Sequence, residues 1–257
     1  MSLEATFFSS YSQLILSCLI ILLAQMIYVI FGFGLGLIAV GLLALFIQPV
    51  TNVIVLVLFI GLPAEIYVVY RSWKNISWQG IFMIGGGVVL GIILGTLILK
   101  YGDPGFILTI LAFFLIFSGI VFLLAQSEVV IHCPSWCAPL IGISAGLLDG
   151  MFGTGGPPLV FYYQLSGMKK QAFRGHLMAL FLLMALVRYP SYALSGLITP
   201  ARFLSAVYVF PAVLLGIWLG NRIHIQVSEK GFRKMISFGL IVIGIILLIK
   251  RGVLSGE

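Results

Sequence analysis

The chain has 257 residues, of which 61% are hydrophobic and 8% are charged, whereas a soluble domain has about half and about a quarter. This composition excludes a soluble globular protein, because helices of about 20 apolar residues are the length that crosses a lipid bilayer. The formal net charge is +7. Its Lys and Arg residues are scattered over short loops between apolar stretches, which favours a role in membrane topology and excludes a nucleic-acid site.

The predicted elements follow one plan in each half of the chain. A stretch at about 11–48 is broken at glycines 32 to 36, and three uninterrupted spans follow at about 52–70, 78–99 and 106–125. A second broken stretch at about 136–166 precedes spans at about 172–196, 202–222 and 232–250. The apolar run from Leu14 onward is too long for a cleaved signal peptide. We therefore expect an all-α polytopic membrane protein whose halves each begin with a glycine-broken helix or re-entrant hairpin, followed by three transmembrane helices.

The two halves are also similar in sequence. The segment Phe31-Gly32-Phe33-Gly34-Leu35-Gly36 returns 121 residues later as Phe152-Gly153-Thr154-Gly155-Gly156-Pro157. Further along, Gly91-Ile92-Ile93-Leu94-Gly95 returns as Gly216-Ile217-Trp218-Leu219-Gly220. Repeats of this kind build many secondary transporters, with the substrate site between them. We predict one transport unit made of two transmembrane repeats, residues 1–127 and 128–257.

The distribution of basic residues predicts that the repeats are inverted. If each broken stretch enters and leaves on one side, nine basic residues share one face, which is then cytoplasmic: Arg71, Lys74, Lys169, Lys170, Arg174, Arg222, Lys230, Arg233 and Lys234. Four are left on the other face: Lys100, Arg202, Lys250 and Arg251. Each half then has an odd number of plain crossings, so the two copies face opposite ways and both termini lie outside.

The glycine breaks are typical of an anion site. Irregular backbone survives inside lipid only where it is buried in protein or lines a watery cavity. Pro157 suits the first turn of a helix, so a half-helix is expected to start near Gly156. Its free amides, and those near Gly34 to Leu37 in the other repeat, would face each other and form a cradle for an anion. Close helix packing is the alternative role for such glycines, and it is our interpretation of Gly85, Gly86, Gly87, Gly91 and Gly95.

At these motifs the chain resembles a known family. Phe-Gly-x-Gly near the start, Gly-Met-Phe-Gly-Thr-Gly-Gly-Pro-Pro at 150–158, and Phe173-Arg174-Gly175 are similar to motifs of the TauE/SafE sulfite exporter family of anion permeases. The resemblance spans nearly the whole chain. It implies transport of sulfite, sulfonates or related organic anions across the bacterial plasma membrane, with no cofactor. The chain differs from the family pattern at Leu35, where another glycine is common, and at His176.

Ionisable residues inside the spans are functional candidates, because they are costly in lipid. Glu65 and Arg188 occupy equivalent positions of the repeats. They could pair across the repeat axis, or Arg188 could bind an oxyanion substrate with its planar guanidinium. The structural alternative is an outward-pointing Glu65 and an Arg188 bonded to carbonyls. Asp149 either couples protons to transport or caps the neighbouring half-helix. His176 is a candidate proton relay or a hydrogen-bonded helix-start residue, and Arg174 either attracts anions to a cytoplasmic mouth or sets topology.

The full set of candidates is therefore as follows. The predicted substrate-binding residues are Gly32, Gly34, Gly36, Gly153, Thr154, Gly155, Gly156, Pro157, Arg188 and Gln25. The predicted coupling residues are Asp149, Glu65 and His176, with Arg174 at the mouth. Uncharged residues around the breaks are weaker candidates: Tyr28, Gln48, Asn52, Tyr162, Tyr163 and Gln164.

Other classes of function fit the sequence less well. An intramembrane enzyme would need a nucleophile and base or a metal set, and no His-Glu-x-x-His motif or paired catalytic aspartates are present. His132, Cys133 and Cys137 are too few to make a convincing metal site. A cation carrier using Asp149 or Glu65 remains the main alternative. The expected partners are the bilayer and a small anion, with proton coupling left open.

Overall fold

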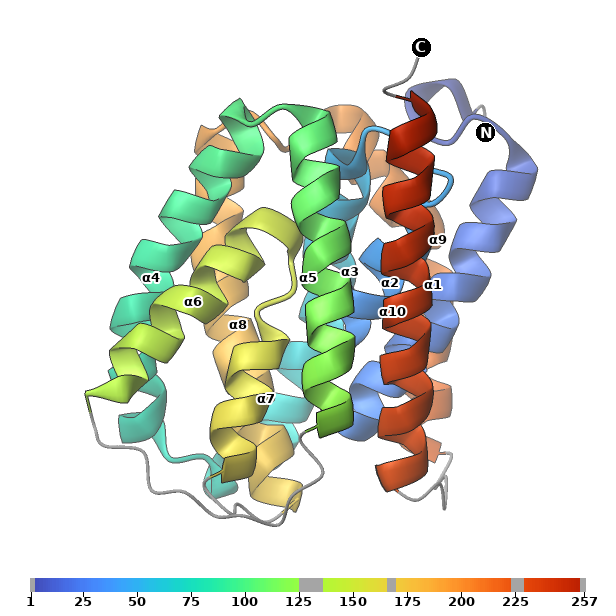
Figure 1. Ribbon diagram of the computed structural model, residues 1–257. Helices are drawn as coiled ribbons and strands as arrows, with labels where there is room; N and C mark the ends of the chain where they lie inside the picture. The colour runs from blue at the N-terminus through green and yellow to red at the C-terminus, as the bar shows by residue number, and fades with distance from the viewer. Residues whose placement is uncertain (1–2, 125–135, 166–169, 223–228, 255–257) are drawn as a thin grey trace.

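The computed structural model describes residues 3–124, 136–165, 170–222 and 229–254. Within these ranges it is helical and contains no strand (Figure 1). The first half contains α1 (Tyr11–Phe31), α2 (Leu35–Leu43), α3 (Val50–Ser72), α4 (Trp78–Tyr101) and α5 (Pro104–Leu124). The second contains α6 (Cys137–Phe152), α7 (Gly156–Leu165), α8 (Lys170–Leu194), α9 (Pro200–Arg222) and α10 (Glu229–Leu254). The predicted all-helical fold is confirmed, and each broken stretch is a pair of helices.

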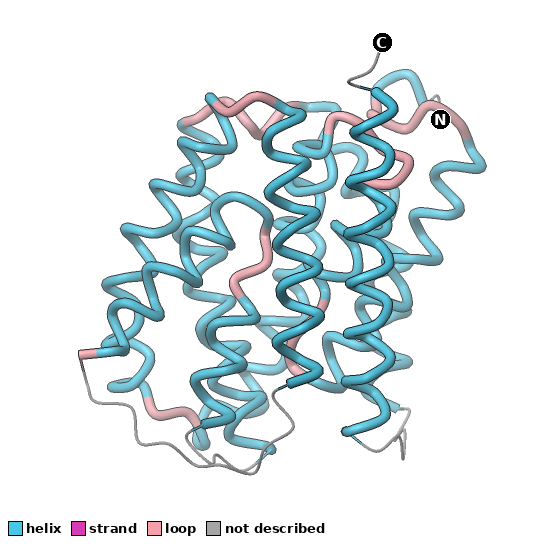
Figure 2. The backbone as a smooth tube through the Cα atoms, in the orientation of Figure 1, coloured by secondary structure: helices cyan, strands magenta, loops and turns pink. Residues whose placement is uncertain are grey.

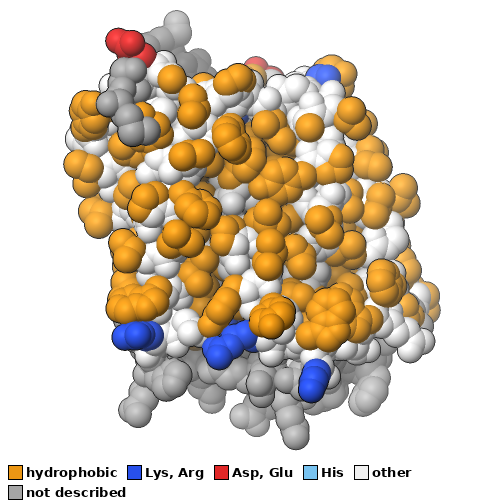
Figure 3. Space-filling view, turned by 180° about the vertical axis from the view of Figure 1, so that it is seen from behind, with side chains coloured by type: hydrophobic (Ala, Val, Ile, Leu, Met, Phe, Trp, Pro, Cys, Tyr) orange, Lys and Arg blue, Asp and Glu red, His pale blue; other side chains and the backbone are white. Residues whose placement is uncertain are grey.

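The length and surface of the helices suit a bilayer. Among the described residues, six helices are long and apolar enough to cross a membrane, namely α1, α3, α4, α5, α8 and α9. Large apolar side chains such as Phe82, Phe117 and Phe238 are exposed on the outside of the bundle. Figure 3 shows this surface as a broad apolar band with Lys and Arg side chains along its lower edge. Such a surface is stable in contact with acyl chains.

The helices of each half alternate in direction. The start of α1 and the end of α10 lie at the upper side in Figure 1. Helix α1 descends from that side and α2 turns back toward it, whereas α6 rises from the lower side and α7 returns there. The two connections inside these pairs, drawn pink in Figure 2, lie near the middle height of the bundle. The irregular backbone is therefore surrounded by helices.

Small residues let helices of different halves pack closely. Helix α4 packs along α6, and α1 packs along α9. A Cβ atom at Gly87, Gly91 or Gly95 of α4 would collide with backbone atoms of α6. In return, a Cβ at any of three glycines of α6 would collide with the backbone of α4: Gly142, Gly146 and Gly150. The packing role predicted for the α4 glycines is therefore confirmed at Gly87, Gly91 and Gly95. At Gly86, by contrast, an added Cβ would meet nothing within 4 Å.

Equivalent helices of the two halves also meet at the centre. Helix α3 packs on α8, and α5 packs on α10. The halves therefore interlock rather than stand side by side as separate bodies. Three residues considered above lie outside the described part of the chain: His132, Cys133 and Lys169. The side chains of five others are also not described: Gln164, Lys170, Lys230, Arg233 and Arg251.

Candidate functional site

The two breaks begin with the same local geometry. Helix α1 ends at Gly32, whose φ of 84° is left-handed and whose N–H donates to the Tyr28 carbonyl at 2.9 Å. Helix α6 ends at Gly153 in the same way, with a φ of 68° and an N–H that donates to the Asp149 carbonyl at 2.7 Å. Glycine adopts these angles at little cost. Each glycine therefore stops one helix and lets the next begin at a new angle.

The breaks touch each other at the centre of the bundle. A Cβ atom at Gly36 would collide with the carbonyl oxygen of Gly153 and the methyl group of Thr154. A buried cavity of about 30 Å³ lies beside this contact. Its lining comes from both breaks and from α3 and α8: Tyr28, Gly34, Leu35, Gly36, Leu37, Val57, Gly61, Glu65, Asp149, Gly153, Thr154, Gly156, Phe181 and Arg188.

The amino ends of α2 and α7 bring unequal numbers of amides to this cavity. The first N–H groups of a helix have no partner inside the helix and carry partial positive charge. In α2 these groups belong to Leu35, Gly36 and Leu37, which all line the cavity. In α7, which begins at Gly156, the next two residues are Pro157 and Pro158 and lack an N–H. The positive end of α2 is therefore better supplied with donors than that of α7, although the sequence analysis expected amides from both ends.

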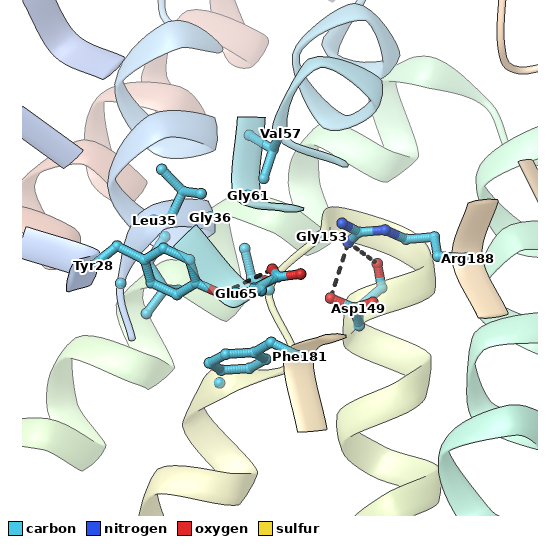
Figure 4. Close-up of a pocket in the computed structure, with 14 residues that line it drawn as sticks. Tyr28, Leu35, Gly36, Val57, Gly61, Glu65, Asp149, Gly153, Phe181 and Arg188 are labelled. Atoms are coloured by element: carbon cyan, nitrogen blue, oxygen red, sulfur yellow. Dashed lines mark hydrogen bonds and ion pairs between the residues drawn. The ribbon is translucent and has the colours of Figure 1, made fainter. Parts of the chain in front are cut away.

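Two polar pairs stand beside the amides (Figure 4). The Tyr28 hydroxyl donates to Glu65 Oε1 at 2.9 Å. Arg188 Nη1 donates to Asp149 Oδ1 at 2.9 Å and to the Asp149 carbonyl oxygen at 3.2 Å. All four side chains are buried. Burying such charges is tolerated only when they are paired and hydrogen-bonded.

The two pairs are equivalent in the repeats. Tyr28 and Asp149 each lie four residues before the left-handed glycine of their break, and Glu65 and Arg188 match at an offset of 123. Of the two alternatives for Glu65 and Arg188, a bond between them is wrong, because each side chain bonds instead to the end of the broken helix in its own half. An outward-pointing Glu65 is also wrong, since only 6% of this residue is exposed. The guanidinium of Arg188 does bond to a carbonyl, as the structural alternative expected.

Several polar atoms around the cavity have no protein partner. They are Glu65 Oε2, Asp149 Oδ2, Thr154 Oγ1 and Arg188 Nε. Buried polar atoms are nearly always satisfied, so unpaired ones gathered at one place indicate a site for a polar ligand or water. The charges are two carboxylates against one guanidinium. With all three ionised, the cavity would have a surplus of negative charge.

The structure brings eight of the predicted site residues together: Gly34, Gly36, Gly153, Thr154, Gly156, Arg188, Asp149 and Glu65. Others lie elsewhere. Gln25 is buried against Gly216 of α9, and its amide atoms have no partner. Pro157 lines an apolar groove between α5 and α6, away from the cavity. Gly155 packs behind the break against Ala145 and Met184.

His176 and Arg174 also lie away from the cavity. His176 Nε2 accepts from the Ser77 N–H at 2.9 Å, and its Nδ1 is 2.8 Å from the Ala172 carbonyl. One ring nitrogen therefore bonds within α8 and the other joins α8 to the start of α4, which matches the hydrogen-bonded alternative. Arg174 lies against Gly32, on the outer side of the first break.

Four contributors to the cavity were missed or undervalued from the sequence, namely Tyr28, Val57, Gly61 and Phe181. Tyr28 was a candidate without an assigned role, although it stands four residues before Gly32, as Asp149 stands before Gly153. Gly61 lies one turn before Glu65, and a Cβ there would be 2.9 Å from Glu65 Oε1. The Phe181 ring, 6.0 Å from the Tyr28 ring, closes another side. The repeat offset could have identified Tyr28, but nothing in the pattern distinguishes Phe181 from other apolar residues of α8.

Sequence comparisons relate this chain to one family of known proteins. The family model described as Sulfite exporter TauE/SafE matches residues 17–247. A curated protein of Cupriavidus necator, named "Probable sulfite/organosulfonate exporter TauE", is 26% identical over 215 residues, which cover 82% of this chain and 84% of that protein. No solved structure matches significantly.

These matches cover both breaks and most of the described helices. The apolar helices and the relatives make the chain a multi-pass protein of the bacterial inner membrane. They also support the transport of a small anion across that membrane. On the extent of the family match, this chain belongs to the TauE/SafE sulfite exporter family.

Proposed function

We propose that this transporter moves sulfite, sulfonates or related organic acids by alternating access, through the cavity between the two breaks. The observation that carries the proposal is the meeting of both breaks, the amino ends of α2 and α7, and Arg188 at one buried cavity. Donors from a helix amino end and a guanidinium are the groups that bind oxyanions best. The named relative from Cupriavidus necator, a probable exporter of sulfite and organosulfonates, supports the same solute class.

The anion would be held mainly from the side of the first repeat. The first-turn amides of α2 and the Gly156 amide would meet its oxygens, while Arg188 Nε, which has no protein partner, offers a further donor. Thr154 adds a hydroxyl that is buried and unpaired. A sulfur centre with two or three oxygens can use such donors from several directions at once.

The charge balance favours coupling to protons. An anion entering between Glu65 and Asp149 meets two carboxylates and a single guanidinium, so repulsion is relieved when one carboxyl group is protonated. Asp149 is in direct ionic contact with Arg188, whereas Glu65 faces a neutral partner, Tyr28. We therefore assign the proton to Glu65, with Tyr28, Asp149 and Arg188 as the groups that face it. One proton would accompany each anion.

The size of the cavity fits a closed state. A volume of about 30 Å³ holds little more than water, so a sulfonate requires the breaks to separate. In the predicted inverted arrangement, α1 with α2 and α6 with α7 would open toward opposite sides of the membrane. The pairs Tyr28–Glu65 and Asp149–Arg188 link each break to a long helix of its own half. We propose that one of these two contacts breaks while the other is kept, so that the cavity opens to one side of the membrane and stays closed to the other.

Flux measurements test the proposal. Purified protein in liposomes should take up labelled sulfite or a simple sulfonate, and an imposed pH gradient should accelerate the uptake. Arg188→Gln should abolish the flux, whereas Lys100→Gln should leave it unchanged, because Lys100 lies over the exposed ring of Tyr101 at the end of α4. Saturable anion flux that survives Arg188→Gln would remove the central site from the mechanism.

A cation carrier is the second candidate, because two carboxylate oxygens at the cavity have no protein partner. That function predicts flux of Na⁺ or another cation without any anion. It also predicts that the double variant Glu65→Gln with Asp149→Asn abolishes cation flux. Cation flux in anion-free vesicles would favour it over the anion mechanism.

A further inference from the structure

A second hollow lies below the first break, on the side predicted to be cytoplasmic. It has a volume of about 460 Å³ and is formed where α1, α3, α8 and α9 come together. Its lining residues are Ile30, Tyr67, Val68, Arg71, Ser72, Arg174 and Asn221. It is separate from the central cavity, with which it shares no lining residue.

Among the described residues that line this hollow, the only charged side chains are basic. Arg71 and Arg174 both line it and are close enough to repel each other, and no carboxylate is among the lining residues. Arg71 Nη1 donates to the Tyr67 hydroxyl at 3.1 Å and the guanidinium lies over the Tyr67 ring. Arg174 Nε is buried and has no partner in the protein. Two guanidiniums that face one space, with no carboxylate among its described lining residues, are stabilised by binding an anion between them.

We propose that this hollow, defined by Arg71 and Arg174, is a second anion site that receives the solute before it reaches the central cavity. This proposal deepens the function proposed above and rests on it for the identity of the solute. The two guanidiniums would bind the sulfonate or sulfite oxygens. The Ser72 hydroxyl and the Asn221 amide supply further polar groups, and a volume of about 460 Å³ also admits an organic tail.

The hollow is connected to the central site through α1 and α3. The stem of Arg174 lies on Gly32, since a Cβ there would be 3.0 Å from Arg174 Cγ. One turn before Gly32, Tyr28 bonds to Glu65, and the wall of the hollow begins two residues after Glu65, at Tyr67. The Tyr28–Glu65 bond therefore stands between the two spaces. The Arg174 side chain therefore runs from the glycine at which the first break bends to the wall of the hollow.

The first test measures transport from each side. Arg71→Gln and Arg174→Gln should raise the KM for anion on the side of the hollow about tenfold or more, as expected for a lost charge-assisted bond. They should leave the kcat and the KM from the opposite side close to the wild-type values. Arg174→Lys should restore part of the affinity. Arg222→Gln is the matched control, because this exposed Arg lies at the same end of the molecule and stacks on Trp218.

The second test measures binding directly. Labelled sulfite should bind the purified full chain at two sites in detergent, with Arg188→Gln removing one and Arg71→Gln the other. If wild-type protein transports anions but neither hollow variant changes the KM or the number of sites, the second site is refuted and the proposed function stands. If sulfite binding depends on Arg71 but no anion is transported, the proposed function fails and the site remains.

The source of the oxyanion also needs an experimental arm, because a lipid phosphate has similar chemistry. The KM should be compared in vesicles of phosphatidylcholine alone and in vesicles containing phosphatidylglycerol. A solute site predicts the same effect of Arg174→Gln in both. An effect that occurs only with the anionic lipid would assign the hollow to a lipid headgroup and overturn the proposal.

Discussion

Replacing Gly36 with Ala provides the sharpest test of the contact between the two breaks. The added methyl group would fall on the carbonyl oxygen of Gly153 and on the Thr154 methyl. The Thr154 side chain can rotate, but the carbonyl belongs to backbone that Gly153 holds at a φ of 68°. The breaks must therefore move apart for the methyl group to fit.

The expected size of the effect follows from this overlap. Extra methyl groups in a packed interior cost about 1–3 kcal/mol, and a penalty of this size that falls on one conformation changes its population about 5- to 150-fold. We expect the rate of anion uptake into liposomes to fall by a factor within that range. The midpoint of thermal unfolding should fall with it.

Gly86→Ala is the matched control for this experiment. Gly86 lies in α4, and a Cβ there would meet nothing within 4 Å. Alanine also favours a helix over glycine by about 1 kcal/mol, so flux and thermal stability should be retained or improved. Wild-type flux and wild-type stability in Gly36→Ala would refute the close contact between the breaks.

Three further predictions address the polar pairs and the topology. Arg188→Gln should destabilise the fold by about 3–5 kcal/mol, because it leaves Asp149 buried without its partner. Adding Asp149→Asn to this variant should recover thermal stability but not anion flux. Recovered flux would contradict the role of Arg188. Glu65→Gln should retain anion flux while removing its acceleration by a pH gradient, and an unchanged pH response would assign the proton elsewhere. In a background without native cysteines, Lys74→Cys should react with an impermeant thiol reagent only from the cytoplasmic side, and Asp103→Cys only from the outside. Reaction of both variants from the same side would exclude the predicted topology.

The sequence was sufficient to predict the helices and the breaks. The apolar runs give the spans because about 20 such residues match the bilayer. The glycines near 32 and 153 give the breaks because they can adopt left-handed φ angles. Both signals are local in the chain, so they could be interpreted without knowing how the helices pack.

The contacts at the centre were harder to predict. Equivalent positions in a repeat imply a similar depth and environment, but they do not imply contact, which is why Glu65 and Arg188 seemed a natural pair. Their actual partners depend on how each break turns toward the third helix of its half. The same limitation applies to Gln25, whose orientation is set by the packing of α1 on α9. The missing N–H groups of Pro157 and Pro158, by contrast, were predictable from covalent chemistry alone.

The interlocking of the halves has a consequence for biosynthesis. The groove of α4 that receives α6 and the face of α1 that receives α9 are complete long before the ribosome has made their partners. During that interval the newly inserted first half must hold a broken backbone in the membrane with its matching surfaces uncovered. We expect a truncated first half to be degraded in cells and to survive when the second half is supplied as a separate chain. Assembly of the transporter would then be a late, all-or-nothing event that follows insertion of the last helix.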